Sequence, residues 1–269
     1  MNVFQAIVLG LVQGATEFIP ISSSGHLVLL PWLLSWPSPG LAFDTVLHLG
    51  TLLALLVILW PDLVALGLAW GRSVTQGRLR APPTRLGWGV LLGTIPAALM
   101  GLLWEQQFEA LFLRPLFVSA FLLVTGLWLV LAEHLGSKEH ELEDISWWQS
   151  SLIGLAQGCA IAPGISRSGA TIGAGMLLGL RRDAATRFSF LLSTPIILAA
   201  GLLQVRRLLA LPNVGAQLLP LALGFLAAFL SGYACIRFLL NYVKQRGLNV
   251  FAAYCWLVGL GTLIVSAAR

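Results

Sequence analysis

Charged residues are scarce in this chain. Only 16 Lys or Arg and 11 Asp or Glu occur among 269 residues, which is 10% of the chain, whereas soluble domains carry roughly 25%. Because 58% of the residues are hydrophobic, too few polar side chains remain to cover a globule in water. The composition excludes a soluble enzyme and a disordered chain, and it indicates a polytopic membrane protein.

Cysteine is also rare. Cys159, Cys235 and Cys255 lie singly in apolar runs, which excludes a disulfide-stapled secreted fold. No segment clusters basic residues among aromatic ones, so the net charge of +5 is an orientation signal and predicts no nucleic-acid partner. Residues 1–20 lack a basic n-region, and Glu17 lies where a signal peptide would be cleaved, so we expect this stretch to belong to the mature fold.

Six stretches are long and apolar enough to cross a membrane as helices, which takes about 20 residues. They are 43–60, 86–104, 115–133, 187–205, 216–236 and 248–267. Placing the 61–85 connection in the cytoplasm puts most of the 16 Lys and Arg on the cytoplasmic side, as the positive-inside rule requires.

Two further apolar regions, 2–34 and 147–180, are interrupted near the middle by Gly, Pro and Ser. Each half is too short to cross the bilayer. The pattern predicts two re-entrant helix hairpins, whose loops are tolerated at membrane depth only where protein or a wet cavity surrounds them. We expect the loops to carry the function.

The two interrupted regions resemble each other. The first reads GLVQGATEFIPISSSGH from Gly10 and the second GLAQGCAIAPGISRSGA from Gly154, with eight identities in seventeen positions at an offset of 144. The chain is therefore one membrane domain over 1–269, with internal repeats at about 1–135 and 146–269. Each half holds one hairpin and three spans, and because three is odd the second half must be inverted relative to the first. The predicted fold is an all-α membrane protein with an inverted-topology repeat.

The repeats differ where chemistry is expected. At the offset of 144, Glu17 matches Ile161, Ser23 matches Arg167, and His26 matches an alanine. A carboxylate, a hydroxyl and an imidazole come from one hairpin and a guanidinium from the other, which suits a phosphate ester, because Arg holds phosphate oxygens in bidentate fashion. The candidate catalytic residues are Ser23, His26, Glu17 and Arg167, and the candidate substrate-binding residues are Gln13, Ser22, Ser24, Gly25, Ser166, Ser168 and Gly169.

Structural roles are the alternative for these residues. Ser and Gly often serve close helix packing in membranes, and Glu17 with Arg167 could form a structural ion pair. Asp44 and His48 are four residues apart on one helix face and could line the cavity, although Asp44 could equally be solvated at a span end.

The stretches QGATEFIPISSSGHLVL from Gln13, PGISRSGATI from Pro163 and FDTVLHLGT from Phe43 resemble the motifs of the bacterial undecaprenyl-diphosphate phosphatase family, the BacA-type bacitracin resistance proteins. The resemblance covers essentially the whole chain. It implies a hydrolase of the bacterial inner membrane that converts undecaprenyl diphosphate to the monophosphate carrier for peptidoglycan synthesis, with the active site facing the periplasm.

The resemblance also implies a divalent cation, Mg²⁺ or Ca²⁺. Many members carry Glu where this chain has Gln13, so Glu17 is the expected ligand, with Gln13 and Asp44 as further candidates. The partners expected are a polyprenyl diphosphate substrate and membrane lipids; the sequence leaves a homodimer open.

Two questions remain open at this point. We take Ser23 as the nucleophile because the repeat pairs it with Arg167, and His26 as a general acid or base, but His26 could itself be the nucleophile. Inverted repeats with broken helices are also a transporter architecture, so transport or flipping of a polyprenyl phosphate or another anion is the alternative function.

Overall fold

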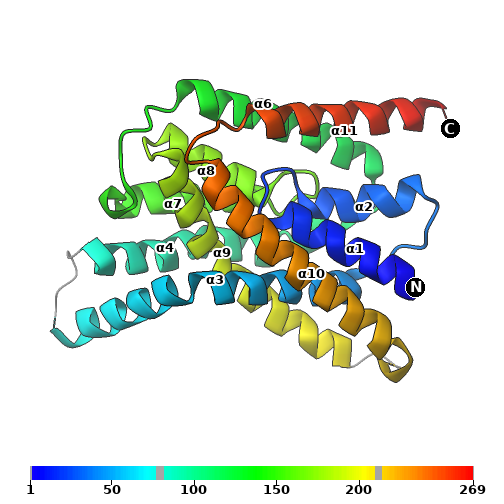
Figure 1. Cartoon of the computed structure of the whole chain (residues 1–269), viewed down its shortest axis with the longest axis horizontal. Helices are drawn as coiled ribbons and strands as arrows, with labels where there is room; N and C mark the ends of the chain where they lie inside the picture. Colours follow the sequence, from blue (N-terminus) through cyan, green and yellow to red (C-terminus); the bar gives the residue numbers. More distant parts are fainter. Residues whose placement is uncertain (1, 77–81, 210–213, 269) are drawn as a thin grey trace.

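The computed structural model describes residues 2–76, 82–209 and 214–268, and within these ranges the fold is all-helical (Figure 1). Eleven α-helices and one 3-10 turn lie in the described residues. They are α1 (Val3–Glu17), α2 (Ser23–Leu33), α3 (Leu41–Gln76), α4 (Pro82–Leu103), α5 (Glu105–Phe112), α6 (Pro115–Leu135), η1 (Leu142–Asp144), α7 (Trp147–Cys159), α8 (Arg167–Leu177), α9 (Arg182–Leu209), α10 (Val214–Tyr242) and α11 (Asn249–Ala268).

Six of the described helices are long and apolar enough to cross a membrane: α3, α4, α6, α9, α10 and α11. The six predicted spans and the all-α class are confirmed, and the chain has the helices of a multi-pass membrane protein. The predicted spans were too short at several ends, however. The connection expected over 61–85 is wrong at both ends, because α3 runs from Leu41 through Pro61 to Gln76, 36 residues in all, and α4 already begins at Pro82. Its positions 77–81 lie outside the described residues, as do positions 210–213 of the connection expected after 205.

The helix breaks predicted in the two interrupted regions are present. Each region forms a pair of short helices, α1 with α2 and α7 with α8, joined by a turn at 18–22 and at 160–166. The loop expected at 105–114 is instead largely the short helix α5, which begins directly after Trp104. Its EQQFEALF sequence contains no Gly or Pro, which explains why it is helical.

Glycines let the first helix of each pair approach a distant helix closely. In α1, a Cβ on Gly10 would lie 2.3 Å from the carbonyl oxygen of Gly224 in α10. In α7, a Cβ on Gly154 would lie 2.0 Å from the carbonyl oxygen of Gly93 in α4. Figure 1 shows α1 running alongside α10. Each short helix therefore packs against a long helix from the opposite half of the chain.

We expect Gly14→Ala to destabilise the fold, because its Cβ would lie 2.0 Å from Ser231 Oγ and 2.5 Å from the carbonyl oxygen of Ala228, both in α10. Overpacking of this kind costs about 1–3 kcal/mol, and the thermal unfolding midpoint in detergent should fall. Gly67→Ala is the matched control, since nothing lies within 4 Å of that added Cβ. Equal midpoints for the two variants would contradict tight α1–α10 packing.

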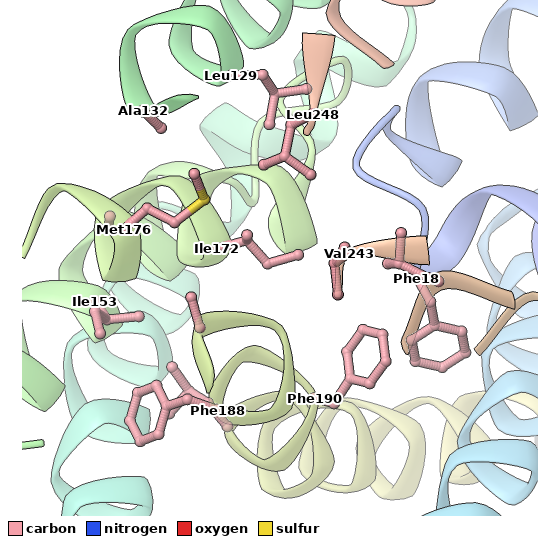
Figure 2. Close-up of a cluster of buried hydrophobic side chains, with 14 of the residues drawn as sticks. Phe18, Leu129, Ala132, Ile153, Ile172, Met176, Phe188, Phe190, Val243 and Leu248 are labelled. Atoms are coloured by element: carbon pink, nitrogen blue, oxygen red, sulfur yellow. The ribbon is translucent and has the colours of Figure 1, made fainter. Parts of the chain in front are cut away.

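Aromatic packing fixes the turn after α1. Phe18, fully buried, contacts Phe190 of α9 with ring centroids 5.2 Å apart in an edge-to-face arrangement, and Figure 2 shows the two rings side by side in the apolar core. The same core includes Ile153 of α7 and Ile172 of α8. Both interrupted regions are thereby anchored in one apolar core, which places their turns in a fixed relation.

Candidate active site

Matching serines begin the second helix of each pair. Ser22 caps α2 by accepting a hydrogen bond from the backbone N–H of Gly25 at 3.3 Å, and Ser166 caps α8 through Gly169 at 3.1 Å. Ser22 adopts φ 70°, a conformation that is costly for a residue with a side chain. Both helix N-termini, with their partial positive charge, are thus held in place by Ser side chains.

The two turns contact each other directly. Ser22 Oγ donates to the carbonyl of Ile165 at 3.4 Å, and Ser168 Oγ donates to the carbonyl of Ile19 at 3.2 Å. Each turn therefore supplies a hydroxyl to the backbone of the other, and the signature residues of the two halves form one site.

Glu17 is the centre of this site. Its carboxylate accepts hydrogen bonds from Arg167 Nη2 at 2.8 Å, from Gln13 Nε2 at 2.9 Å and from the hydroxyl of Ser23. His48 Nε2 lies 3.6 Å from the same carboxylate. A carboxylate that is only 6% exposed requires such compensation, because burying an unpaired charge is very unfavourable.

A cavity of about 350 Å³ opens beside this cluster. Eight residues singled out from the sequence line it: Glu17, Ser22, Ser23, Ser24, Asp44, His48, Ser166 and Arg167. Gln157 lines it too, together with apolar residues of α2, α4, α5, α9 and the turn at 160–166. Four candidates from the sequence lie behind the wall of the cavity instead: Gln13, Gly25, Ser168 and Gly169. Gln13 positions Glu17, and the other three hold the two turns.

His26 faces away from the cavity. Its Nδ1 lies 2.7 Å from the carbonyl of Ser22 and its Nε2 lies 2.9 Å from the hydroxyl of Tyr254 in α11. Both ring nitrogens therefore have hydrogen-bond partners, and His26 is not among the residues that line the cavity. The imidazole that lies beside Glu17 is His48, which comes from the FDTVLHLG stretch and not from either turn.

Several polar atoms at the cavity have no hydrogen-bond partner within the described part of the chain. They are Arg167 Nη1, Asp44 Oδ1 and both amide atoms of Gln157, all buried. Arg167, which lines the cavity, thus uses Nη2 on Glu17 and leaves Nη1 without a partner in the described residues. A phosphate oxygen would complete this arrangement, since Arg forms paired hydrogen bonds with phosphate.

The residues present fit a divalent cation only in part. Among the described residues, no three His, Cys, Asp or Glu side chains gather in a way that could hold a metal ion. Both oxygens of Glu17 already accept hydrogen bonds, whereas Asp44 Oδ1 has no partner. Mg²⁺ is often held by one or two carboxylates plus substrate phosphates, and Asp44 is suited to that role.

An apolar cavity of about 470 Å³ adjoins the first. The two share Leu27, Asp44, Glu109 and Phe112 in their walls, and the second extends to Trp32. Both cavities are lined mainly by apolar side chains, and the first also has the polar cluster around Glu17 in its wall. A polar cluster beside apolar space is the combination that an amphiphilic ligand requires.

These features define a class: a multi-pass membrane protein with a buried carboxylate–guanidinium pair in the wall of a cavity. The model of the family described as bacitracin resistance protein BacA matches residues 6–261. Relatives named undecaprenyl-diphosphatase are 46% identical in Rubrobacter xylanophilus, over 94% of both chains, and 44% identical in Moorella thermoacetica, over 99% of this chain and 98% of the relative. An archaeal relative of the same name, from Methanosphaera stadtmanae, is 42% identical over 99% of both chains. The chain belongs to the BacA family.

Proposed function

We propose that this protein hydrolyses undecaprenyl diphosphate to undecaprenyl phosphate and inorganic phosphate, recycling the lipid carrier of peptidoglycan synthesis. The names of the full-length relatives support this assignment. The observation that carries it is the cluster itself: a serine hydroxyl hydrogen-bonded to a buried carboxylate, which is paired with a cavity-lining arginine whose second nitrogen has no partner in the described part of the chain. The apolar second cavity suits the first units of the prenyl tail.

In the first step, Ser23 Oγ attacks the terminal phosphorus in line. The hydroxyl proton passes to Glu17, which already accepts its hydrogen bond, and the bond from this phosphorus to the bridging oxygen breaks. The lipid monophosphate leaves with the electron pair of that bond. Arg167 Nη1 and the N-terminus of α2 stabilise the charge on the transferring group, which is the main task of a phosphoryl-transfer site.

In the second step, water attacks the phosphoserine and the bond to Ser23 Oγ breaks. Glu17 returns its proton to Ser23, and both water protons remain on the inorganic phosphate. His48 lies beside Glu17 and positions this carboxylate. Because Ser23 lines the cavity whereas His26 does not and has both ring nitrogens engaged, the geometry favours Ser23 over His26 as the nucleophile, and His26 anchors α2 to α11.

We propose further that Asp44 would hold a divalent cation, Mg²⁺ or Ca²⁺, since its Oδ1 has no other partner among the described residues. When bound, the cation would neutralise part of the substrate charge. Asp44 lines both cavities, so a ligand there would lie where the diphosphate meets the prenyl tail.

The two helix pairs are, in this proposal, re-entrant hairpins of an inverted repeat. The support is reciprocal packing: α1 of the first half lies on α10 of the second, and α7 of the second lies on α4 of the first. The close approaches at the turns are also reciprocal, since Gly25 faces Gly164 and Gly169 faces Pro20, and these pairs exchange under the offset of 144.

The bacterial inner membrane and a periplasm-facing site are part of the same proposal. The positive-inside count supports this orientation. A homodimer remains a prediction.

Transport of a polyprenyl phosphate is the second candidate, and the reciprocal packing favours it because alternating-access transporters use such repeats. A transporter requires the anion-binding Arg167 but no nucleophile. The hydrogen bond from the Ser23 hydroxyl to Glu17 therefore favours hydrolysis.

Detergent-purified protein should release phosphate from a C55 or C15 prenyl diphosphate, because in detergent there are no two sides between which to transport. We expect release to rise with Mg²⁺ or Ca²⁺ and to fall with EDTA, measured as inorganic phosphate over time. Heat-inactivated protein is the control. No release under any of these conditions would refute the hydrolase assignment and favour transport.

A further inference from the structure

Gln157 is a buried polar side chain whose amide makes no hydrogen bond within the described residues. It is 2% exposed and lines the cavity beside Arg167. Neither its amide nitrogen nor its amide oxygen has a hydrogen-bond partner in the described residues. Buried amides in proteins are nearly always paired, so an unpaired amide on a cavity wall points to a ligand.

The repeat explains why this amide has no partner. Gln13 is its counterpart in the first half and donates to Glu17, four residues later, at 2.9 Å. Four residues after Gln157 the chain has Ile161, which cannot accept a hydrogen bond but also lines the cavity. The same Gln side chain therefore holds a carboxylate in one half and is left unpaired in the other.

We propose that Gln157 is a substrate-binding residue whose amide N–H donates a hydrogen bond to a non-bridging oxygen of the diphosphate. This inference rests on the proposed function. Arg167 Nη1 is a charged donor, and the amide of Gln157 is a neutral one. Both residues line the cavity and come from the second half of the chain. The ligand class is a diphosphate, either of a polyprenyl alcohol or as free pyrophosphate.

Gln157→Leu separates this role from a packing role. The variant removes an unpaired buried amide, so without ligand it should be at least as stable to heat as the wild type. Its KM for a prenyl diphosphate should nevertheless rise by about 10- to 100-fold, the range for a hydrogen bond to a charged group. Gln157→Glu should raise KM further, because its carboxylate repels the diphosphate.

Gln149→Leu is the matched control in the same helix. Gln149 donates to the carbonyl of Leu178 at 2.8 Å and accepts from the backbone N–H of Ser146 at 2.8 Å. This amide is structural, so its loss should lower the thermal midpoint and leave KM unchanged, the reverse of the effects expected for Gln157→Leu.

A second readout is the rise in thermal midpoint that inorganic pyrophosphate produces in the wild type. Gln157→Leu should lose most of this rise and Gln149→Leu should keep it. A wild-type response in Gln157→Leu, in both KM and pyrophosphate stabilisation, would overturn the proposal. If the wild type fails to hydrolyse prenyl diphosphates, the proposed function is wrong, and the pyrophosphate shift alone decides whether Gln157 binds a diphosphate.

Discussion

Ser23→Ala is expected to lower kcat for prenyl diphosphate hydrolysis by about 10⁴-fold or more, because loss of a nucleophile removes the covalent route altogether. The protein should remain folded, since the hydroxyl contributes one of several hydrogen bonds to Glu17. Phosphate release from a C15 diphosphate and trapping with substrate labelled in the terminal phosphate are the measurements. Wild-type protein quenched in acid should carry acid-stable phosphate on Ser23.

Ser151→Ala is the control for this experiment, because its hydroxyl donates to the carbonyl of Trp147 within α7, away from the cavity. It should retain normal turnover. Label in an acid-labile, histidine-type linkage, with Ser23→Ala still active, would show that His26 or His48 is the nucleophile and that the serine mechanism is wrong.

Arg167→Lys should lower kcat/KM by about 10²- to 10³-fold, although the charge is retained. The guanidinium donates through Nη2 to Glu17 and leaves Nη1 free of partners among the described residues, for the substrate. A lysine ammonium is a point charge on a flexible stem and cannot hold both positions at once. Steady-state kinetics on a prenyl diphosphate, together with the thermal midpoint, measure the effect.

Arg187→Lys provides the comparison. Arg187 donates to both carboxylate oxygens of Asp62 at 2.9 Å in a largely exposed pair between α9 and α3, and such pairs contribute little to stability. The Arg187→Lys variant should hydrolyse substrate at the normal rate. Near-normal turnover by Arg167→Lys would contradict the proposal that Arg167 contacts the carboxylate of Glu17 and the substrate at once.

The helix breaks could be predicted because Gly, Pro and Ser leave a local signal. The turns after Glu17 and Cys159 fall where these residues interrupt the apolar runs. The end of α3 was missed for the opposite reason. Pro61 and Asp62 resemble a helix end in sequence, yet a proline costs less in a membrane helix because neighbouring groups satisfy the freed carbonyl.

The partners of the ionisable groups could be predicted only in part. The comparison of the two repeats predicted that Glu17 and Arg167 belong to one site, and they do form an ion pair. It also placed His26 in the catalytic set, whereas the structure directs that ring toward Tyr254 and brings His48 to the carboxylate. The sequence positions of His26 and His48 are both compatible with a site near Glu17. The direction in which each helix points its histidine decides which ring reaches that carboxylate.

By itself, the sequence determined the membrane class, the six spans and the two helix breaks, and it indicated most of the polar residues that line the cavity. These depend on composition and on short-range periodicity, which act along the chain. The tertiary structure decided which side chains meet: Ser23 with Glu17, Arg167 across 150 residues, and Gln157 with none. Such contacts depend on how two helix pairs pack through glycines against distant helices, and packing of that kind leaves no mark in the local pattern of either segment.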